Sequence, residues 1–293
     1  MAKQWLAESD ETTIVVVGPT ASGKTELSLE LASALDGEIV SADSVQIYRH
    51  FDLGSGKPSP SERAQARHHM IDVADPMDAF DAAMFVQQAR AACNEIRARG
   101  RRPIVCGGTF LWVKALFWGL AKTPGASAEI RAKHERLRRE HGPLALHDQL
   151  RVVDPTSAER LHPNDFVRVS RALEVHELSG VPLSTFHAQH AFQEVWGAPK
   201  LMARRHTPEQ LTLRIQQRLQ GWLGAGFQEE VRDLTARGYG ESRAMASVGY
   251  KEVYACEQGA FPEAELEERA VRATRIFARR QRTWLNHEPV TWV

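Results

Sequence analysis

The sequence predicts an α/β protein with a parallel sheet core and an all-helical insertion domain. Apolar strand-length runs alternate with helical segments in the first part of the chain, and a glycine-rich turn follows the first run. A charged, helical stretch without strand signals then begins near residue 122. We therefore expect a core made of residues 1–121 and 196–293, with a helical domain at 122–195.

Each element of the core has its own signal. The run TTIVVV at residues 12–17 is apolar throughout, as in a strand buried on both faces. The helix after it places leucines at helical spacing and is predicted to end at Gly37. Further elements alternate: a strand at 38–43, a weaker strand at 68–76, a helix at 81–99 and a strand at 102–109. After residue 206 the pattern is helical to the end of the sequence.

Composition sets limits on location and partners. The 293 residues include 37 basic and 37 acidic side chains, but the first 100 hold 9 basic and 15 acidic ones, which leaves a basic remainder suited to a polyanion. Three cysteines without CxxC spacing fit a reducing compartment and give no zinc site. No apolar signal segment occurs at the start, and the longest apolar run is too short to cross a bilayer. We expect a cytoplasmic protein without a membrane partner.

The turn after the first strand reads GPTASGKT, a phosphate-binding loop of the kind found in P-loop NTPases. Its glycines let backbone N–H groups surround an anion, its lysine reaches terminal phosphate oxygens, and the hydroxyl of Thr25 is a ligand for Mg²⁺. The alternative is a turn that only joins strand to helix. The predicted diphosphate- or nucleotide-binding residues are Gly18, Pro19, Thr20, Ala21, Ser22, Gly23, Lys24 and Thr25.

Two more polar turns follow predicted strands: Ser41-Ala42-Asp43-Ser44 and Gly107-Gly108-Thr109. Ligands of open parallel sheets bind beyond the carboxyl ends of the strands, so we expect both turns to share one pocket with the phosphate loop. Asp43 is a candidate Mg²⁺ ligand or general base, and the alternative is a residue that only caps a turn. Thr109 is a candidate for contacting the same ligand, or part of a purely steric turn.

Basic segments lie in the later part of the chain. Residues 269–282 carry six arginines and no acid, which predicts either a phosphate-contacting stripe or a solvated face paired with the acids just before it. Arg168 and Arg171 stand one helical turn apart and have the same two readings.

Together these motifs resemble, in this order, the bacterial tRNA dimethylallyltransferases. The resemblance spans roughly residues 12–286 and is carried by GPTASGKTELSLELA, IVSADSVQIYR, GSGKPS, HHMIDVADP, VCGGTFLWVKAL, HPNDFVRVSRALEV, AGFQEEVRDL, SVGYKE and ATRIFARRQRTWL. It implies transfer of a dimethylallyl group from dimethylallyl diphosphate to N6 of adenosine 37 in tRNAs that read codons beginning with U. It also implies Mg²⁺, a monomer, and diphosphate as the group held by the loop.

The resemblance implies a role for each matched residue. Asp43 is the expected catalytic base and Thr109 a catalytic residue that orients donor or adenine, while the insertion clasps the anticodon stem-loop. The target base leaves its stack, as in other base-modifying enzymes. The implied tRNA-binding residues are Asp43, Ser44, Val45, Gln46, Thr109, Arg131, Val167, Arg168, Val169, Ser170, Arg171, Ala246, Ser247, Val248, Gly249, Tyr250 and Lys251.

One departure and three rival functions stand beside this interpretation. Lys251 occupies a position where bacterial relatives usually have arginine, and lysine lacks the bidentate fork. The rivals are a small-molecule kinase, an ATP-driven RNA-binding motor or switch, and an enzyme that prenylates free adenine nucleotides. A basic helical insertion exceeds the needs of a small acceptor, and no apolar strand ends in an Asp-Glu pair that would activate water.

Overall fold

The computed structural model describes residues 12–191 and 193–293, so the first eleven residues, where we expect no signal peptide, lie outside it. Its core is a six-stranded sheet in the order β3-β2-β4-β1-β5-β6. Every neighbouring pair of strands is parallel, which confirms the predicted α/β fold with a parallel sheet. The strands are β1 (Thr12–Val17), β2 (Gly37–Ser41), β3 (His68–His69), β4 (Arg102–Gly107), β5 (Ala198–Ala203) and β6 (Thr291–Trp292).

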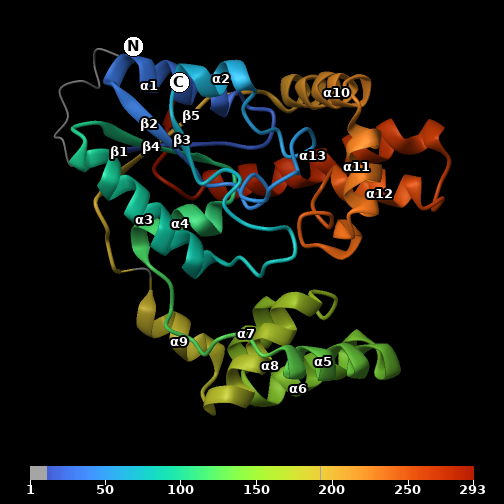
Figure 1. Cartoon of the computed structure of the whole chain (residues 1–293). Helices are drawn as coiled ribbons and strands as arrows, with labels where there is room; N and C mark the ends of the chain where they lie inside the picture. Colours follow the sequence, from blue (N-terminus) through green and yellow to red (C-terminus); the bar gives the residue numbers. More distant parts are fainter. Residues whose placement is uncertain (1–11, 192) are drawn as a thin grey trace. The chain divides into compact units, whose positions relative to one another are not determined.

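Helices cover both faces of the sheet. Figure 1 shows α1 (Lys24–Leu35) on one side and α3 (Ala82–Ala98) with α4 (Phe110–Trp118) on the other. Ile14 and Val16 pack against the leucines of α1, and strand alternation turns Val15 and Val17 to the opposite face. All four side chains are buried, which explains why β1 reads as an unbroken apolar run.

The remaining helices of the core lie between β5 and β6 in the chain, except for the short α2, which lies between β2 and β3. The last helix, α13, packs on α10 through an apolar contact between Ala278 and the pair Leu211 and Ile215. These helices are α2 (Pro60–Gln65), α10 (Pro208–Gly224), α11 (Phe227–Ala236), α12 (Tyr250–Glu257) and α13 (Leu266–Leu285).

The sheet differs from the predicted one at its ends. Strand β5 pairs with β1 along Thr12–Val16, although its sequence APKLMA, after a glycine and with an internal proline, reads as a loop. The prediction of helix alone after residue 206 is also wrong, because β6 extends the sheet beside β5. Residues 68–76 contain only the two-residue strand β3. Helix α1 ends at Asp36, which adopts the left-handed conformation, and Gly37 is already in β2.

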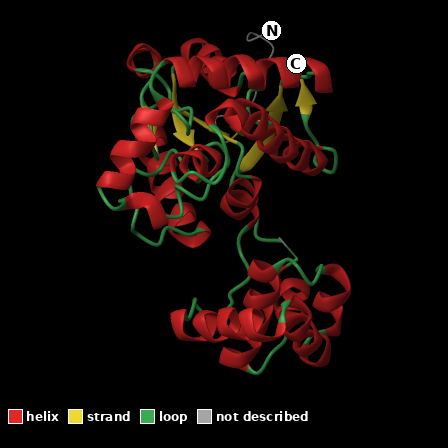
Figure 2. Cartoon of the chain, turned by 90° about the vertical axis from the view of Figure 1, so that its right-hand side faces the viewer, coloured by secondary structure: helices red, strands yellow, loops and turns green. Residues whose placement is uncertain are grey.

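A second compact unit, Trp118–Val195, interrupts the core between Phe117 and Trp196. Its described residues form only helices and loops (Figure 2), and the unit begins at Trp118 rather than at residue 122. Leu146, Leu150 and Leu173 belong to its separate apolar core. The helices are α5 (Ala128–His141), α6 (Pro143–Val153), α7 (Pro155–Arg160), α8 (Phe166–Ser179) and α9 (Leu183–His190). Within residues 12–191 and 193–293, no helix combines the length and apolarity that a membrane crossing requires.

Candidate functional site

The phosphate loop connects the end of β1 to the start of α1, as predicted. Gly23 caps the helix in the left-handed conformation (φ 79°), so this position favours glycine. The ammonium of Lys24 donates a hydrogen bond to the carbonyl of Pro19 at 2.8 Å, which folds the side chain back over the loop. Ser22 is buried, and its hydroxyl has no partner within the described chain. The unpaired N–H groups of the first helical turn make this end of α1 attractive to an anion.

Two cations lie beside this loop. Burial is the main cause that lowers the pKa of Lys24 to about 8; Cys106 and Asp43 oppose this shift and the nearby Arg218 adds to it. Burial also lowers the pKa of Arg218 to about 10, so both groups are charged at neutral pH. The guanidinium of Arg218 donates to the hydroxyl of Thr20 at 3.4 Å and forms no ion pair within 4.0 Å among the described residues. Two cations without an ion-pair partner among the described residues, placed beside the N-terminus of a helix, favour the approach of an anion.

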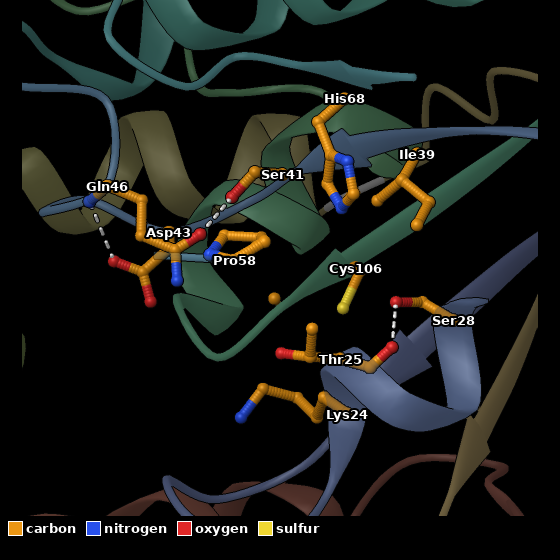
Figure 3. A pocket seen from close by; sticks show the side chains of 11 residues that line it. Lys24, Thr25, Ser28, Ile39, Ser41, Asp43, Gln46, Pro58, His68 and Cys106 are labelled. Carbon is orange, nitrogen blue, oxygen red and sulfur yellow. Dashed lines mark hydrogen bonds between the residues drawn. The ribbon is translucent and has the colours of Figure 1, made fainter. Parts of the chain in front are cut away.

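One pocket joins the loop to the turn after β2 (Figure 3). Lys24 and Thr25 lie on one side of it and Asp43 on the other, and Cys106 and His68 also line it. The carboxylate of Asp43 accepts hydrogen bonds at Oδ1 from the N–H groups of Val45 (2.9 Å) and Gln46 (3.3 Å). Its Oδ2 accepts no hydrogen bond from any described residue, so one oxygen remains available to a ligand.

The two predicted polar turns are held together by direct contacts. The hydroxyl of Thr109 accepts a hydrogen bond from the N–H of Ser44 at 3.0 Å and donates to the Ser44 hydroxyl at 3.2 Å. The N–H of Thr109 donates to the carbonyl of Ala42 at 3.2 Å. A Cβ on Gly107 would lie 2.1 Å from that same carbonyl oxygen, so the approach requires glycine. Thr109 therefore fixes the turn that carries Asp43.

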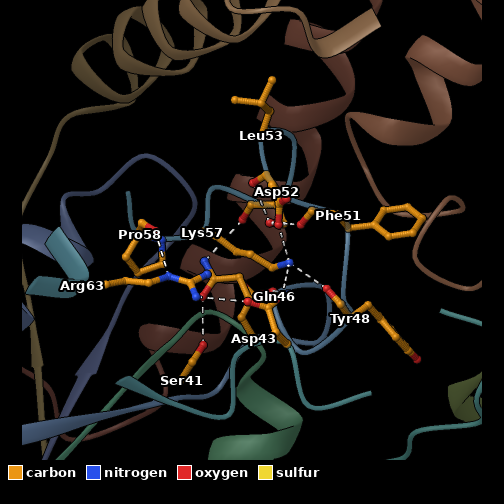
Figure 4. Close-up of polar contacts among 12 residues, drawn as sticks. Ser41, Asp43, Gln46, Tyr48, Phe51, Asp52, Leu53, Lys57, Pro58 and Arg63 are labelled. Carbon is orange, nitrogen blue, oxygen red and sulfur yellow. Dashed lines mark hydrogen bonds and ion pairs between the residues drawn. The ribbon is translucent and has the colours of Figure 1, made fainter. Parts of the chain in front are cut away.

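The segment after Asp43 is held in place by a network of polar contacts (Figure 4). The side chain of Lys57 is only 3% exposed, and its ammonium bonds Asp52 at 2.8 Å, Asp72 at 2.6 Å and one backbone carbonyl. Gln46 accepts a hydrogen bond from Ser41 at 2.9 Å and donates to a carbonyl at 3.0 Å. The sequence-predicted Gln46 is thus a bridge within the chain, with its side chain fully engaged.

Several residues that contact the phosphate loop from far along the chain escaped the sequence interpretation, among them two whose contacts meet at Thr20. Arg218 on α10 and Gln281 on α13 both contact the phosphate loop at Thr20. Helical periodicity places each on its helix but does not say which loop that helix covers. The clustering of basic residues on α10 and α13 was the signal available in the sequence.

Several predicted RNA contacts in the insertion have partners within the protein. The carboxylate of Glu174 is fully buried and accepts hydrogen bonds from Arg131 (2.9 and 3.1 Å) and Arg171 (2.5 Å). Arg168 is 73% exposed and pairs with Asp165 within its own helix. Val167 is 76% exposed. Val169 and Ser170 are buried, so their side chains contribute to packing.

The segment 246–251 likewise contains both exposed and buried residues. Ala246 and Lys251 are exposed and Ser247 and Val248 are half-buried, whereas Gly249 and Tyr250 are buried. The phenol of Tyr250 donates to the carboxylate of Glu230, whose other oxygen accepts the N–H of Leu53 at 2.8 Å. Burial raises the pKa values of both Tyr250 and Glu230. Through Glu230, the Tyr250 side chain therefore anchors the backbone at Leu53, in the segment that follows Asp43.

The arginines of α13 lie on its exposed face. Arg269 forms an ion pair with Glu265 at 2.7 Å. The other exposed arginines form no ion pair within the part of the chain that the structure describes, so the acids before the helix do not neutralise them. They are Arg272, Arg275, Arg279 and Arg280.

Comparison with known proteins gives a consistent result. The family model described as IPP transferase matches residues 46–288. The tRNA dimethylallyltransferase of Sorangium cellulosum is 56% identical over 280 residues, which cover 96% of this chain and 89% of that protein. The tRNA dimethylallyltransferase of Geobacter sulfurreducens is 44% identical over 290 residues, 98% of this chain and 93% of its own length.

Solved structures agree with the sequence relatives. The full-length tRNA isopentenylpyrophosphate transferase of Bacillus halodurans superposes with a TM-score of 0.70 at 34% identity, over 97% of this chain and 89% of that one. A eukaryotic dimethylallyltransferase, solved while acting on tRNA, has a TM-score of 0.76 at 26% identity, over 94% and 69% of the two chains. The phosphate loop at the end of β1, with the polar turns locked beside it, thus stands in a chain that belongs to the IPP transferase family, the family of the bacterial tRNA dimethylallyltransferases.

Proposed function

We propose that this protein transfers the dimethylallyl group of dimethylallyl diphosphate to N6 of adenosine 37 in tRNA. The observation that carries the proposal is the pocket in which Lys24 and Thr25 of the phosphate loop face the carboxylate of Asp43, which has one unengaged oxygen. Family membership and the activity in the names of the relatives support the same reaction.

The diphosphate of the donor would occupy the loop at residues 18–25. Lys24 and Arg218 would neutralise the charge that develops as the carbon–oxygen bond breaks, and the N-terminus of α1 would add its partial charge. Mg²⁺ fits the hydroxyl of Thr25 in the first turn of α1. The described residues contain no group of three or more His, Cys, Asp or Glu side chains that could hold a metal, so the ion would depend on diphosphate oxygens and water. When bound, it supplies further positive charge to the leaving group.

Asp43 would accept the proton of the adenine amine as that nitrogen attacks the allylic carbon. The new N–C bond forms, the C–O bond to diphosphate breaks, and the proton moves to Oδ2 of Asp43. The exocyclic amine is a weak nucleophile because its lone pair is delocalised into the purine. A positioned base typically contributes about 10²–10⁴-fold. Thr109 would keep Asp43 in place through its two hydrogen bonds with Ser44.

The tRNA would meet basic surface from both units. In the insertion, Arg168 and Arg131 are both exposed, and Arg131 shares the charge of Glu174 with the less exposed Arg171. In the core, the exposed α13 arginines Arg272, Arg275, Arg279 and Arg280 and the exposed Lys251 offer phosphate contacts. We also propose a monomeric enzyme of the cytoplasm, the compartment where its tRNA substrate is found.

One assay distinguishes this function from its rivals. The protein is mixed with Mg²⁺, labelled dimethylallyl diphosphate, a free adenine nucleotide and tRNA that carries unmodified adenosine 37, and a parallel reaction replaces the donor with labelled ATP. Label in the RNA supports the proposal, whereas label only in a free nucleotide, or phosphate transfer from ATP, contradicts it. Asp43→Asn keeps the size of the side chain and loses the base, so kcat should fall about 10²–10⁴-fold with tRNA affinity within a few-fold. The matched control is Asp81→Asn at the start of α3, where Asn also caps a helix and kcat should not change.

A further inference from the structure

Gln281 forms a bridge between the phosphate loop and the turn that carries Thr109. Its Oε1 accepts a hydrogen bond from the N–H of Thr20 at 2.8 Å, and its Nε2 donates to the carbonyl of Gly108 at 2.9 Å. The side chain is 6% exposed, so neither bond competes freely with water. The two partners fix the orientation of the amide, because a flipped side chain would oppose donor to donor and acceptor to acceptor.

The geometry around Gln281 leaves little freedom. A Cβ on Gly108 would lie 2.5 Å from Nε2 of Gln281, 3.4 Å from the carbonyl of Gly18 and 3.6 Å from the ammonium of Lys24. The amide therefore lies in the same small volume as the phosphate loop and its lysine. One turn later on α13, Trp284 stacks on Phe110 at the start of α4, with ring centres 4.2 Å apart and planes 6° apart. Helix α13 thus holds both sides of the cradle by separate contacts.

We propose that Gln281 is a positioning residue of the transfer reaction. It sets the distance between the loop that holds the donor diphosphate and the Gly107-Gly108-Thr109 turn that holds the base Asp43 in place. Its role is to keep the N–H of Thr20 and the carbonyl of Gly108 fixed, while its own atoms make no contact with either substrate. The inference rests on the proposed function for its kinetic consequences, but the effect on anion binding can be measured without it.

Inorganic pyrophosphate with Mg²⁺ is the probe for anion binding. Gln281→Met keeps the length of the side chain and removes both hydrogen bonds, leaving buried groups unpaired, so the affinity for pyrophosphate should fall about 10–100-fold. Gln281→Glu keeps an acceptor for Thr20, loses the donor for Gly108 and adds a negative charge beside the anion site. It should therefore bind pyrophosphate more weakly than Gln281→Met at equal thermal stability, whereas the loss in Gln281→Met, which adds no charge, reports the two hydrogen bonds alone.

The control variant is Thr274→Val on the same helix, where the hydroxyl bonds only the carbonyl of Ala270 within α13. It should bind pyrophosphate within about twofold of the wild type. Steady-state kinetics then separate the substrates: kcat/KM for the donor should fall for both Gln281 variants, with KM for tRNA within twofold. All binding is measured at least 15 °C below each melting temperature, and Gln281→Glu, which retains one bond, serves if Gln281→Met does not fold.

Two results would overturn the inference. One is pyrophosphate affinity within twofold of the wild type in both Gln281 variants. The other is an equal loss of pyrophosphate and tRNA affinity, which would mean that α13 is merely destabilised. If the wild-type protein binds Mg²⁺ and pyrophosphate but transfers no dimethylallyl group to tRNA, the proposed function is contradicted. The effect of Gln281 on anion binding is then still judged from the pyrophosphate affinities of the variants.

Discussion

The close approach of Gly107 to the turn that carries Asp43 makes Gly107→Ala an informative change. A Cβ at this position would lie 2.1 Å from the carbonyl oxygen and 2.5 Å from the carbonyl carbon of Ala42, both backbone atoms. An ordinary contact begins at 3.4 Å, so the Ala42 peptide must move by more than about 1 Å. That carbonyl accepts the N–H of Thr109, and Asp43 is the next residue in the chain.

Such a shift has two separate costs. Overpacking should lower the free energy of unfolding by about 1–3 kcal/mol and the melting temperature by roughly 2–10 °C. Misplacement of the base by about 1 Å should lower kcat about 10²-fold, because proton transfer depends on geometry. The matched control is Gly221→Ala in α10, where a Cβ meets nothing within 4 Å. It should raise stability by about 0.5–1 kcal/mol and leave kcat unchanged.

The assays are thermal unfolding and single-turnover transfer of label to tRNA. If Gly107→Ala unfolds at the wild-type temperature, the close approach to Ala42 is absent in solution. If it is destabilised but retains the wild-type kcat, the position of Ala42 does not control the base, and the reasoning fails at that step.

Three further predictions test other parts of the molecule. The pKa of Lys24 is lowered to about 8, so the ammonium loses its proton as pH rises through 8 and affinity for pyrophosphate should fall between pH 7 and 9.5. Lys24→Arg keeps its charge and should show a flatter profile in the same titration; identical profiles would exclude this cause. Tyr250→Phe removes the donor to a buried carboxylate and should lower stability by about 1–3 kcal/mol in urea denaturation, and an unchanged midpoint would contradict that contact. Arg279→Glu combined with Arg280→Glu should weaken tRNA binding at least tenfold at low salt and reduce its salt dependence, with pyrophosphate affinity within twofold. Arg237→Glu, which breaks a surface ion pair on α11, is the control, and an equal effect of both changes would exclude a specific role for α13.

The sequence predicted the parts of the site that depend on strand ends. The phosphate loop, Asp43 and Thr109 each follow a strand of the parallel sheet, and carboxyl ends of parallel strands meet at one edge. Their convergence follows from topology, and the structure brings all three together around the same edge. Correct assignment of the three strands from the sequence was therefore enough to predict that these three segments lie together.

Contacts between residues far apart in the sequence could not be predicted in this way. Strand β5 was missed because its pairing with β1 compensates for a proline and a lysine that local propensity assigns to a loop. Arg218 and Gln281 were missed because periodicity gives the face of a helix and not its neighbour. Arg131 and Arg171 look like free cations in the sequence, and only the packing of α5 against α8 reveals the buried Glu174 between them.

The hydrogen bond from Thr20 to Gln281 joins residues 261 positions apart. During synthesis on the ribosome, the signature GPTASGKT emerges first, whereas the glutamine that braces it on α13 emerges 261 residues after Thr20. A nascent chain therefore displays the recognisable motif long before it has a complete cradle. Premature termination between the phosphate loop and α13 yields a product that still carries the motif but lacks one wall of the site.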